Sequence, residues 1–219
     1  MRKRIRVGIL FGGKSAEHEV SIRSARNVLK ALNIEKFEPV LIGIDKNGSW
    51  HSLDNPKNLF NASLFLPTTA LPDKPQMTSL LKTDAVLQLE THISSALEGL
   101  DVVFPILHGP FGEDGTVQGL LKLLNIPFVG AGVLGSAIGM DKDVTKRLLR
   151  DAKILTAKFI VAKINAVPEY EGVARKLGSP VFIKPANLGS SVGVNKVNTK
   201  TEYAKALKEA FRFDRKILL

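Results

Sequence analysis

The segment Phe182–Val194 combines a lysine with a loop of small polar residues. Lys184 follows Phe182 and Ile183 in an apolar run, and the loop Leu188–Gly193 contains two serines and two glycines. A lysine inside an apolar strand is costly unless its charge is paired, whereas the N–H groups and hydroxyls of such a loop can bind phosphate oxygens. We therefore predict a clamp for a polyphosphate, in which Lys184 is buried and its ammonium points at the loop. A plain hairpin is the alternative, and it leaves Lys184 unexplained.

A second group of polar residues follows the turn Gly12-Gly13. Glu17 and Glu19 lie near the start of an expected helix, where the helix dipole favours acids. At the C-terminal edge of a parallel sheet, a carboxylate is also well placed to hold the ammonium of a ligand. On these residues alone, capping of the helix by Ser15 with two favourable acids is the simpler interpretation.

His108 and Glu113 lie in a glycine-rich turn directly after the apolar run Asp101–Leu107. A structural turn needs the glycines but neither the histidine nor the acid, so these two side chains indicate a site. One histidine and two acids do not make a coordination shell, which argues against a metal centre here. Lys142, in the run Met140-Asp141-Lys142, is interpreted on its own as a solvated lysine.

The segment Gly8–Ser15 fits the phosphate-loop pattern G-x-x-x-x-G-K-[ST], and Asp45 resembles the metal ligand of such a site. In a true phosphate loop the strand ends before the first glycine, whereas here Ile9–Phe11 continue the strand beyond Gly8. We therefore expect that this segment is not a phosphate loop. Mutation of Lys14 is accordingly expected to leave nucleotide binding intact.

Apolar runs and amphipathic segments alternate along the chain, which is typical of an α/β protein. In the first part, the pattern predicts strands at residues 6–11, 39–44 and 101–107 and helices at 15–32 and 116–124. Strand, helix and strand in this order form a βαβ unit, which predicts a parallel sheet.

Two units are expected, at residues 1–135 and 136–219. Residues 54–83 contain four prolines and little periodicity, so we interpret them as an insertion or a long surface loop. In the second unit, the loop 188–193 is short enough to join neighbouring antiparallel strands. The further elements expected are strands at 127–129, 159–162, 181–184, 194–197 and 216–219 and helices at 141–152, 170–177 and 201–211.

The composition is that of an ordinary globular protein, with 44% hydrophobic and 24% charged residues among 219. Cysteine is absent, which excludes disulfides, thiolate metal sites and a cysteine nucleophile. No apolar run reaches the roughly 20 residues of a membrane span, and the N-terminal apolar stretch is too short for a signal peptide. We therefore expect a cytoplasmic protein with no membrane partner.

Positive charge is concentrated in the last third of the chain. Residues 141–219 carry seventeen basic and eight acidic side chains, and the net charge of the whole chain is +10. Such an excess favours phosphates, on a nucleotide or a nucleic acid, although solvated helix faces are the simpler explanation for most of these lysines. Aromatic residues make up only 6% and form no stacking platform, so we expect no nucleic-acid partner.

Taken in order, these segments resemble the D-alanine–D-alanine ligases of the ATP-grasp superfamily. The similarity extends from Val7 to Leu219, interrupted mainly at 54–83, and rests on four motifs in register. The motifs are Gly12-Gly13…Ser15-Ala16-Glu17…Glu19-Val20-Ser21, His108-Gly109…Gly112-Glu113-Asp114-Gly115…Gln118-Gly119, Met140-Asp141-Lys142 and Lys184-Pro185…Gly189-Ser190-Ser191-Val192-Gly193. The resemblance implies an α/β fold with a parallel-sheet, Rossmann-like pre-ATP-grasp domain, followed by a smaller α+β ATP-grasp subdomain and without the family's third domain.

The resemblance also implies a reaction, the ATP-dependent joining of two D-alanines for peptidoglycan and hence for cell-wall synthesis and cell shape. One carboxylate is phosphorylated to an acyl phosphate, which the amine of the second D-alanine attacks. By position, Glu17 is expected to hold the first ammonium and Ser190 to orient that substrate, and these are the two catalytic candidates. Both are expected to face one cavity, which His108 and Glu113 also line.

The same resemblance assigns the ATP phosphates to Lys142 and Lys184. The loop expected to close over the phosphates consists of Leu188, Gly189, Ser190, Ser191, Val192 and Gly193. Mg²⁺ or Mn²⁺ is expected with ATP, and no metal ligand is assigned within the chain because the family's acidic ligands lie in its third domain. The expected partners are D-alanine, ATP and a second copy of the chain in a homodimer.

Besides the expected lack of the third domain, the sequence departs from the family at two local positions. Lys153 stands where the family commonly has glycine, and Leu155-Thr156 lacks the usual proline. Because the metal ligands are not assigned, we expect that the 219 residues alone do not form D-alanyl-D-alanine. A ligase that uses D-lactate as second substrate and a non-catalytic nucleotide-binding fragment are the alternatives.

Overall fold

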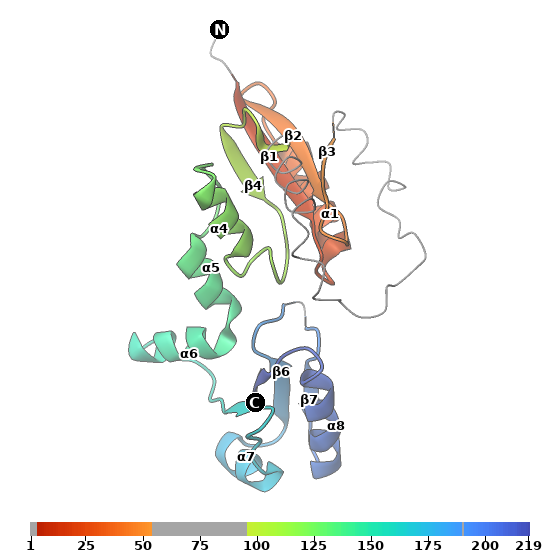
Figure 1. The fold of residues 1–219 in the computed structure, drawn as a ribbon. Helices are drawn as coiled ribbons and strands as arrows, with labels where there is room; N and C mark the ends of the chain where they lie inside the picture. The colour runs from red at the N-terminus through yellow and green to blue at the C-terminus, as the bar shows by residue number, and fades with distance from the viewer. Residues whose placement is uncertain (1–3, 54–95, 190) are drawn as a thin grey trace, which may run out of the picture. The chain divides into compact units, whose positions relative to one another are not determined.

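The computed structural model describes residues 4–53, 96–189 and 191–219, and Figure 1 shows its ribbon. The chain divides into two compact units, of which the first consists of Met1–Gly112 and Val117–Gly130 and the second of Glu113–Thr116 and Ala131–Leu219. The expected insertion at 54–83 lies outside the described residues. In the described ranges, no helix has the length and apolar character needed to cross a membrane.

The first unit is built on a mainly parallel sheet. Its elements are β1 (Ile5–Gly12), α1 (His18–Ala31), β2 (Phe37–Ile44), β3 (Trp50–Leu53), β4 (Val102–Pro105) and nearly all of α4 (Thr116–Leu123). The strand order is β3-β2-β1-β4, with β1 parallel to both β2 and β4 and with β3 antiparallel to β2. The predicted βαβ unit with a parallel sheet is therefore confirmed.

Helices cover both faces of this sheet because successive side chains of β1 point in opposite directions. Ile9 and Phe11 belong to a buried cluster with Ile22 of α1. Leu10 belongs to a second cluster with Leu121 of α4. A parallel sheet buried on both faces leaves its ligand sites at the carboxyl ends of its strands.

The second unit contains a separate antiparallel sheet. Its elements are α5 (Val133–Met140), α6 (Lys142–Asp151), β5 (Val161–Lys163), α7 (Tyr170–Leu177), β6 (Val181–Pro185), β7 (Asn195–Val197), α8 (Lys200–Ala210) and β8 (Lys216–Leu218). The order is β5-β8-β6-β7, and every pairing is antiparallel. Ile183 and Ile217 of the sheet share a buried cluster with Val173 of α7 and Ala206 of α8. A parallel α/β unit followed by a smaller α+β unit confirms the predicted fold class.

Two predicted elements differ from the structure for local reasons, and one strand was not predicted. The helix expected from residue 15 begins at His18, because the Ser15 hydroxyl holds the preceding residues in a turn. The strand expected at 127–129 is only a single bridge between Val103 and Phe128, since Pro127 has no N–H to donate. β3 was not predicted, and it forms a hairpin with β2 across the turn at Asp45–Gly48.

Candidate functional site

The Gly8–Ser15 pattern is not a phosphate loop in the structure. Gly8 lies inside β1, where it pairs with Val40 on one side and Val103 on the other. The side chain of Lys14 lies over the β2–β3 turn, where a Cβ on Gly48 would come within 2.3 Å of Lys14 Cε. The expectation from the sequence is thus confirmed, because the strand passes straight through the first glycine of the pattern.

Glu17 and His108 lie close together at the carboxyl ends of β1 and β4. The Ser15 hydroxyl donates to the His108 carbonyl at 2.6 Å and accepts from the Glu17 N–H at 3.2 Å. A Cβ on Gly109 would lie 2.7 Å from Glu17 Oε2, and the φ of Gly109 is +73°. Glycine is therefore required at 109, both for its backbone conformation and for the space that the carboxylate occupies.

Hydroxyl groups of α1 fix this edge of the sheet. Ser21 Oγ accepts from the Gly12 N–H at 2.8 Å and donates to the Ile106 carbonyl. One turn further on, Ser24 Oγ lies 3.1 Å from His108 Nε2. The sequence interpretation gave Ser21 no role beyond its place in the first motif and missed Ser24, although their spacing of three places them on one helix face. They bind the ends of β1 and β4 to α1 and so position the Glu17–His108 edge.

The other two substrate-site candidates are Glu113 and Ser190. Glu113 is exposed and belongs to the second unit. Ser190 lies outside the described residues. The expectation that Glu17, Ser190, His108 and Glu113 line one cavity therefore stays a prediction.

In the second unit, Lys142 lies where α6 begins and where β6 ends. Its N–H donates to the Ala186 carbonyl at 3.1 Å, and its Nζ donates to the same carbonyl at 3.2 Å. The same ammonium also donates to the Leu188 carbonyl, at the start of the loop 188–193. The third and fourth motifs, 42 or more residues apart in the chain, thus meet at one point.

Asp141 holds the start of α6 in this place. Its carboxylate accepts from the N–H groups of Asp143 at 3.0 Å and Val144 at 3.1 Å, as an N-cap does. Lys216 Nζ of β8 lies 2.5 Å from Asp141 Oδ2. Burial alone raises the pKa of Asp141, but the Lys216 and backbone hydrogen bonds outweigh burial and lower it below the ordinary value.

The lysines near the end of β6 repel one another. Burial and then the charge of Lys184 lower the pKa of Lys142, while Asp214 and Asp141 oppose this shift. Burial and the charge of Lys184 also lower the pKa of Lys146, one turn along α6. The sequence interpretation missed Lys146, although its spacing of four from Lys142 places both on one helix face. Three ammonium groups therefore act on each other here, which is the electrostatic setting for an anion.

The prediction that Lys184 is buried is wrong, because the side chain is half-buried. Val181 and Ile183 of β6 face the core with α7 and α8, so the alternation of a strand places Phe182 and Lys184 on the opposite face. Phe182 is 54% exposed. An apolar run does not reveal which of its two faces is covered, and Lys184 needs no buried partner.

The loop after β6 is held at both ends. Asp214 accepts from the Asn187 N–H at 2.8 Å and from its side-chain amide at 2.9 Å. Ser191 and Gly193 have φ values of 61° and 68°, and a Cβ on Gly193 would lie 2.9 Å from Pro185 Cγ. Consecutive turns of this kind present backbone N–H groups, which suit phosphate oxygens.

Metal ligands do not gather in the part of the chain that the structure describes. Within residues 4–53, 96–189 and 191–219, no three His, Asp or Glu side chains are arranged to hold an ion. These residues therefore do not fit a divalent metal site, and no chemical step is derived through one.

Two family models match the chain. The model described as D-ala D-ala ligase N-terminus matches residues 6–131, and the model described as D-ala D-ala ligase C-terminus matches residues 148–219. Among curated proteins, D-alanine–D-alanine ligase A of Chromobacterium violaceum is 49% identical over 219 residues, which cover 99% of this chain and 60% of that protein. D-alanine–D-alanine ligase A of Escherichia coli K12 is 47% identical over 222 residues, with coverages of 99% and 60%.

Solved structures of similar proteins align over nearly the whole chain. The D-alanine–D-alanine ligase of Coxiella burnetii superposes with a TM-score of 0.80 at 33% identity and covers 98% of this chain and 63% of its own. The VanG D-Ala:D-Ser ligase of Enterococcus faecalis gives a TM-score of 0.73 at 32% identity, with coverages of 99% and 62%. The chain thus spans about 60% of the length of the curated relatives that it matches.

Proposed function

The chain belongs to the D-alanine–D-alanine ligase family, and on that premise we propose that it carries ATP-binding residues and the first substrate site of an enzyme that joins two D-alanines. The observation that carries this proposal is the position of Lys142 at the start of the loop 188–193, where burial and then the charge of Lys184 lower its pKa. A polyanion such as a triphosphate relieves this repulsion.

Each element at this point has a proposed part in holding ATP. Lys142 and Lys184 neutralise phosphate oxygens, and the N–H groups of Leu188–Gly193 close over them. Phe182 presents an exposed ring on the face of β6 that carries Lys184, so we propose that the adenine base packs on this ring. Asp214 keeps the start of the loop in place through Asn187.

The proposed site for the first D-alanine is the edge formed by Glu17 and His108. The Glu17 carboxylate binds the substrate ammonium, and Ser15 and Ser24 keep Glu17 and His108 in place. Ser190 and Glu113 remain proposed members of the same site. The γ-phosphoryl group of ATP passes to the substrate carboxylate, which gives an acyl phosphate and ADP. The amine of the second D-alanine then attacks the acyl carbonyl, the new amide loses a proton, and inorganic phosphate leaves.

We propose the cytoplasm as the place of this reaction, peptidoglycan synthesis as its purpose and a homodimer as the assembly. Mg²⁺ or Mn²⁺ is proposed as the counter-ion of the phosphates, with no ligand assigned among the described residues. Membership of the family does not fix the second substrate, since one similar solved structure is a D-Ala:D-Ser ligase. Dipeptide or depsipeptide formation from D-alanine, D-serine or D-lactate, by the protein that contains this chain, separates the three possibilities.

The nucleotide part of the proposal is tested by titrating the purified chain with ATP in a calorimeter. Lys184→Ala is expected to weaken ATP binding by about 10- to 100-fold, because a charged hydrogen bond contributes roughly 1.5–3 kcal/mol. Lys205→Ala removes an exposed lysine of α8 and is the matched control. Equal affinities for Lys184→Ala and the unchanged chain contradict the assignment of Lys184 to the phosphates.

The substrate part is tested separately with D-alanine. Glu17→Gln keeps the size of the side chain and removes its charge, so D-alanine affinity is expected to fall about tenfold or more while ATP affinity stays unchanged. A fall in ATP affinity of the same size in Glu17→Gln contradicts the separation of the two sites.

A further inference from the structure

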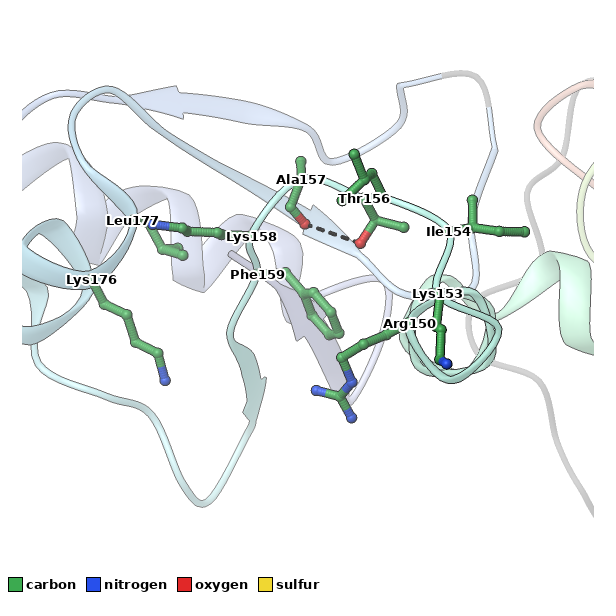
Figure 2. Close-up of a pocket in the computed structure, with 10 residues that line it drawn as sticks. Arg150, Lys153, Ile154, Thr156, Ala157, Lys158, Phe159, Lys176 and Leu177 are labelled. Carbon is green, nitrogen blue, oxygen red and sulfur yellow. Dashed lines mark hydrogen bonds between the residues drawn. The ribbon is translucent and has the colours of Figure 1, made fainter.

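A cavity of about 550 Å³ opens between the end of α6, the segment 153–159 and the end of α7 (Figure 2). None of the residues proposed above to bind ATP or D-alanine lines it. Its size falls in the range of cavities that hold small organic ligands, roughly 300–1,000 Å³. It is therefore a second candidate site within the second unit.

The charged residues that line this cavity are all cations. They are Arg150, Lys153, Lys158 and Lys176, and no acidic residue is among the lining side chains. Through their side chains, none of the four makes a hydrogen bond or an ion pair with residues that the structure describes, whereas Lys200 and Lys216 are paired with acids. Four unpaired like charges around one hollow favour a bound anion.

The floor of the cavity is apolar. Phe159 and Leu177 are half-buried in it, and Ile154 and Leu155 at its rim are 55% and 99% exposed. One face of the Phe159 ring is occupied by Lys146, whose Nζ lies 5.1 Å from the ring centroid. Figure 2 draws Phe159 between the side chains of Arg150 and Lys176. Apolar and aromatic surface between cations suits an anion that carries an apolar body.

The backbone at the rim is in a conformation that favours glycine. Lys153 has a φ of 59°, and it follows the end of α6 at the position where a left-handed residue closes a helix. A lysine in this conformation is strained, and strained residues cluster at binding sites. Here the strained residue supplies one of the four cations.

We propose that this cavity binds a small organic anion, with a carboxylate, sulfonate or phosphate group paired to the four cations and an apolar or aromatic body on Phe159 and Leu177. The proposal does not depend on the ligase function. Its occupant has one acidic end and one apolar end, which separates it from inorganic phosphate and from an uncharged hydrophobe.

The test uses the full chain and the fluorescent probe 1-anilinonaphthalene-8-sulfonate, which joins an aromatic body to a sulfonate. The affinity for the probe is expected to fall two- to fivefold in each of the variants Arg150→Gln, Lys153→Gly and Lys176→Gln, as for the loss of an exposed charge pair. In the triple variant that combines them, it is expected to fall at least tenfold. Leu155→Ser is expected to weaken it without a change in charge, since the apolar body loses contact. Lys205→Gln is the matched control and is expected to leave the affinity unchanged.

Further measurements separate the possible occupants. The uncharged analogue N-phenyl-1-naphthylamine is expected to bind at least tenfold more weakly, and added salt is expected to weaken the sulfonate probe. An unchanged affinity in the triple variant overturns the proposal, as does an equal loss in Lys205→Gln. If Lys184→Ala lowers the affinity for the probe as much as the triple variant does, the probe binds at the proposed ATP site, and the proposal of a second site is overturned. A polyglutamate peptide is compared with a monomeric carboxylate as a competitor of the probe. If the peptide displaces the probe at a far lower concentration, the occupant is an acidic polypeptide, and the small-ligand assignment is overturned.

Discussion

Lys142 carries its charge where the surrounding protein opposes it. Among the residues that the structure describes, the ammonium donates to two carbonyl oxygens, and burial and Lys184 both lower its pKa. The charged form of such a lysine is disfavoured in the folded state, so at neutral pH it lowers the free energy of unfolding. The free energy of unfolding increases as pH rises from the lowered pKa of the folded state towards the pKa of Lys142 in the unfolded chain. Residues proposed to bind a polyanion are thus arranged at some cost to the fold.

Substitution of Lys142 by methionine separates binding from stability. Lys142→Met is expected to weaken ATP binding about tenfold or more. The free energy of unfolding is expected to stay within about 1 kcal/mol, because the lost ammonium hydrogen bonds are offset by the removal of repulsion. Calorimetry measures the first quantity and urea denaturation the second. A loss of stability of several kcal/mol shows instead that Lys142 is mainly structural.

ATP affinity is expected to decrease with rising pH. Lys142 loses its proton at a lower pH than an ordinary lysine, so the site loses positive charge as pH rises towards the ordinary lysine pKa. Lys142→Arg keeps its charge over this range, and its affinity is expected to change less. Parallel pH profiles for the two proteins rule out Lys142 as the source of the decrease.

The two ends of α6 illustrate how an element places the residues around it. At its start, Asp141 caps the helix and pairs with Lys216, which keeps Lys142 at the end of β6. At its end, Ala152 and Lys153, whose φ lies in the left-handed region, connect the helix to the segment 153–159 that lines the second cavity. One helix of ten residues therefore fixes both the proposed ATP site and the second site.

Loss of the cap at Asp141 is expected to destabilise the second unit. Asp141→Ala is expected to cost about 1 kcal/mol, because two N–H groups lose their acceptor. Asp141→Asn keeps a capping oxygen and is expected to cost less. Because the pKa of Asp141 is lowered, its contribution is present above the ordinary value and is lost as pH falls below it. Thermal unfolding of the three proteins at neutral and acid pH measures this, and equal costs for both variants contradict the capping role.

Removal of the backbone strain at Lys153 is expected to stabilise the protein. Lys153→Gly is expected to raise the free energy of unfolding by about 0.5–1 kcal/mol, since glycine adopts this φ without strain. Ala152→Gly, one residue earlier at a φ of −74°, is the control and is expected to lower stability by a similar amount. Chemical denaturation compares the three proteins. A destabilised Lys153→Gly shows that the lysine side chain contributes more than its backbone costs.

Much of the element pattern follows from local sequence. The apolar run before Gly12-Gly13 predicts β1, and the pattern at 170–177 predicts α7 at its observed bounds. β3 escaped prediction because Trp50–Leu53 is too short and too polar to show periodicity, and it exists only through pairing with β2. Local patterns identify elements, whereas pairing partners are a property of the folded chain.

The site was predicted in its residue types but not in its environment. The resemblance to the family's motifs identifies Glu17 and Lys142 as candidates, and the structure gives each of them a definite neighbourhood. The half-buried state of Lys184 and the support from Ser21 and Ser24 depend on which faces other elements cover. The bonds of Ser21 to Ile106 and of Ser24 to His108 join residues 85 and 84 positions apart, which no local window contains.

At the scale of the whole molecule, the two units have separate cores. Ile9 and Leu10 anchor the first, and Ile183 and Ile217 anchor the second. The matched family models likewise divide between the two parts of the chain. We therefore expect that loss of packing in one unit is not transmitted in full to the other.

The single tryptophan allows this to be measured. Trp50 belongs to the first unit and packs against its core. Ile183→Ala is expected to destabilise the second unit by about 2–5 kcal/mol, which lowers the unfolding midpoint seen by far-UV circular dichroism. The midpoint seen by Trp50 fluorescence is expected to stay in place, whereas Ile9→Ala shifts it. Coincident shifts of both signals in Ile183→Ala show a single cooperative unit.

The central position of β1 in its sheet has a consequence for synthesis on the ribosome. β2 can pair with β1 soon after residue 44 emerges, but β4, which covers the other edge of β1, ends 61 residues later at Pro105. At about 5–20 residues per second, the nascent chain carries an open strand edge for roughly 3–12 s. During that time the backbone groups of Val7–Leu10 that later pair with β4 can pair with another chain. Newly made first units are therefore expected to pair less with other chains when chaperones are present or the nascent chains are dilute, until β4 has been made.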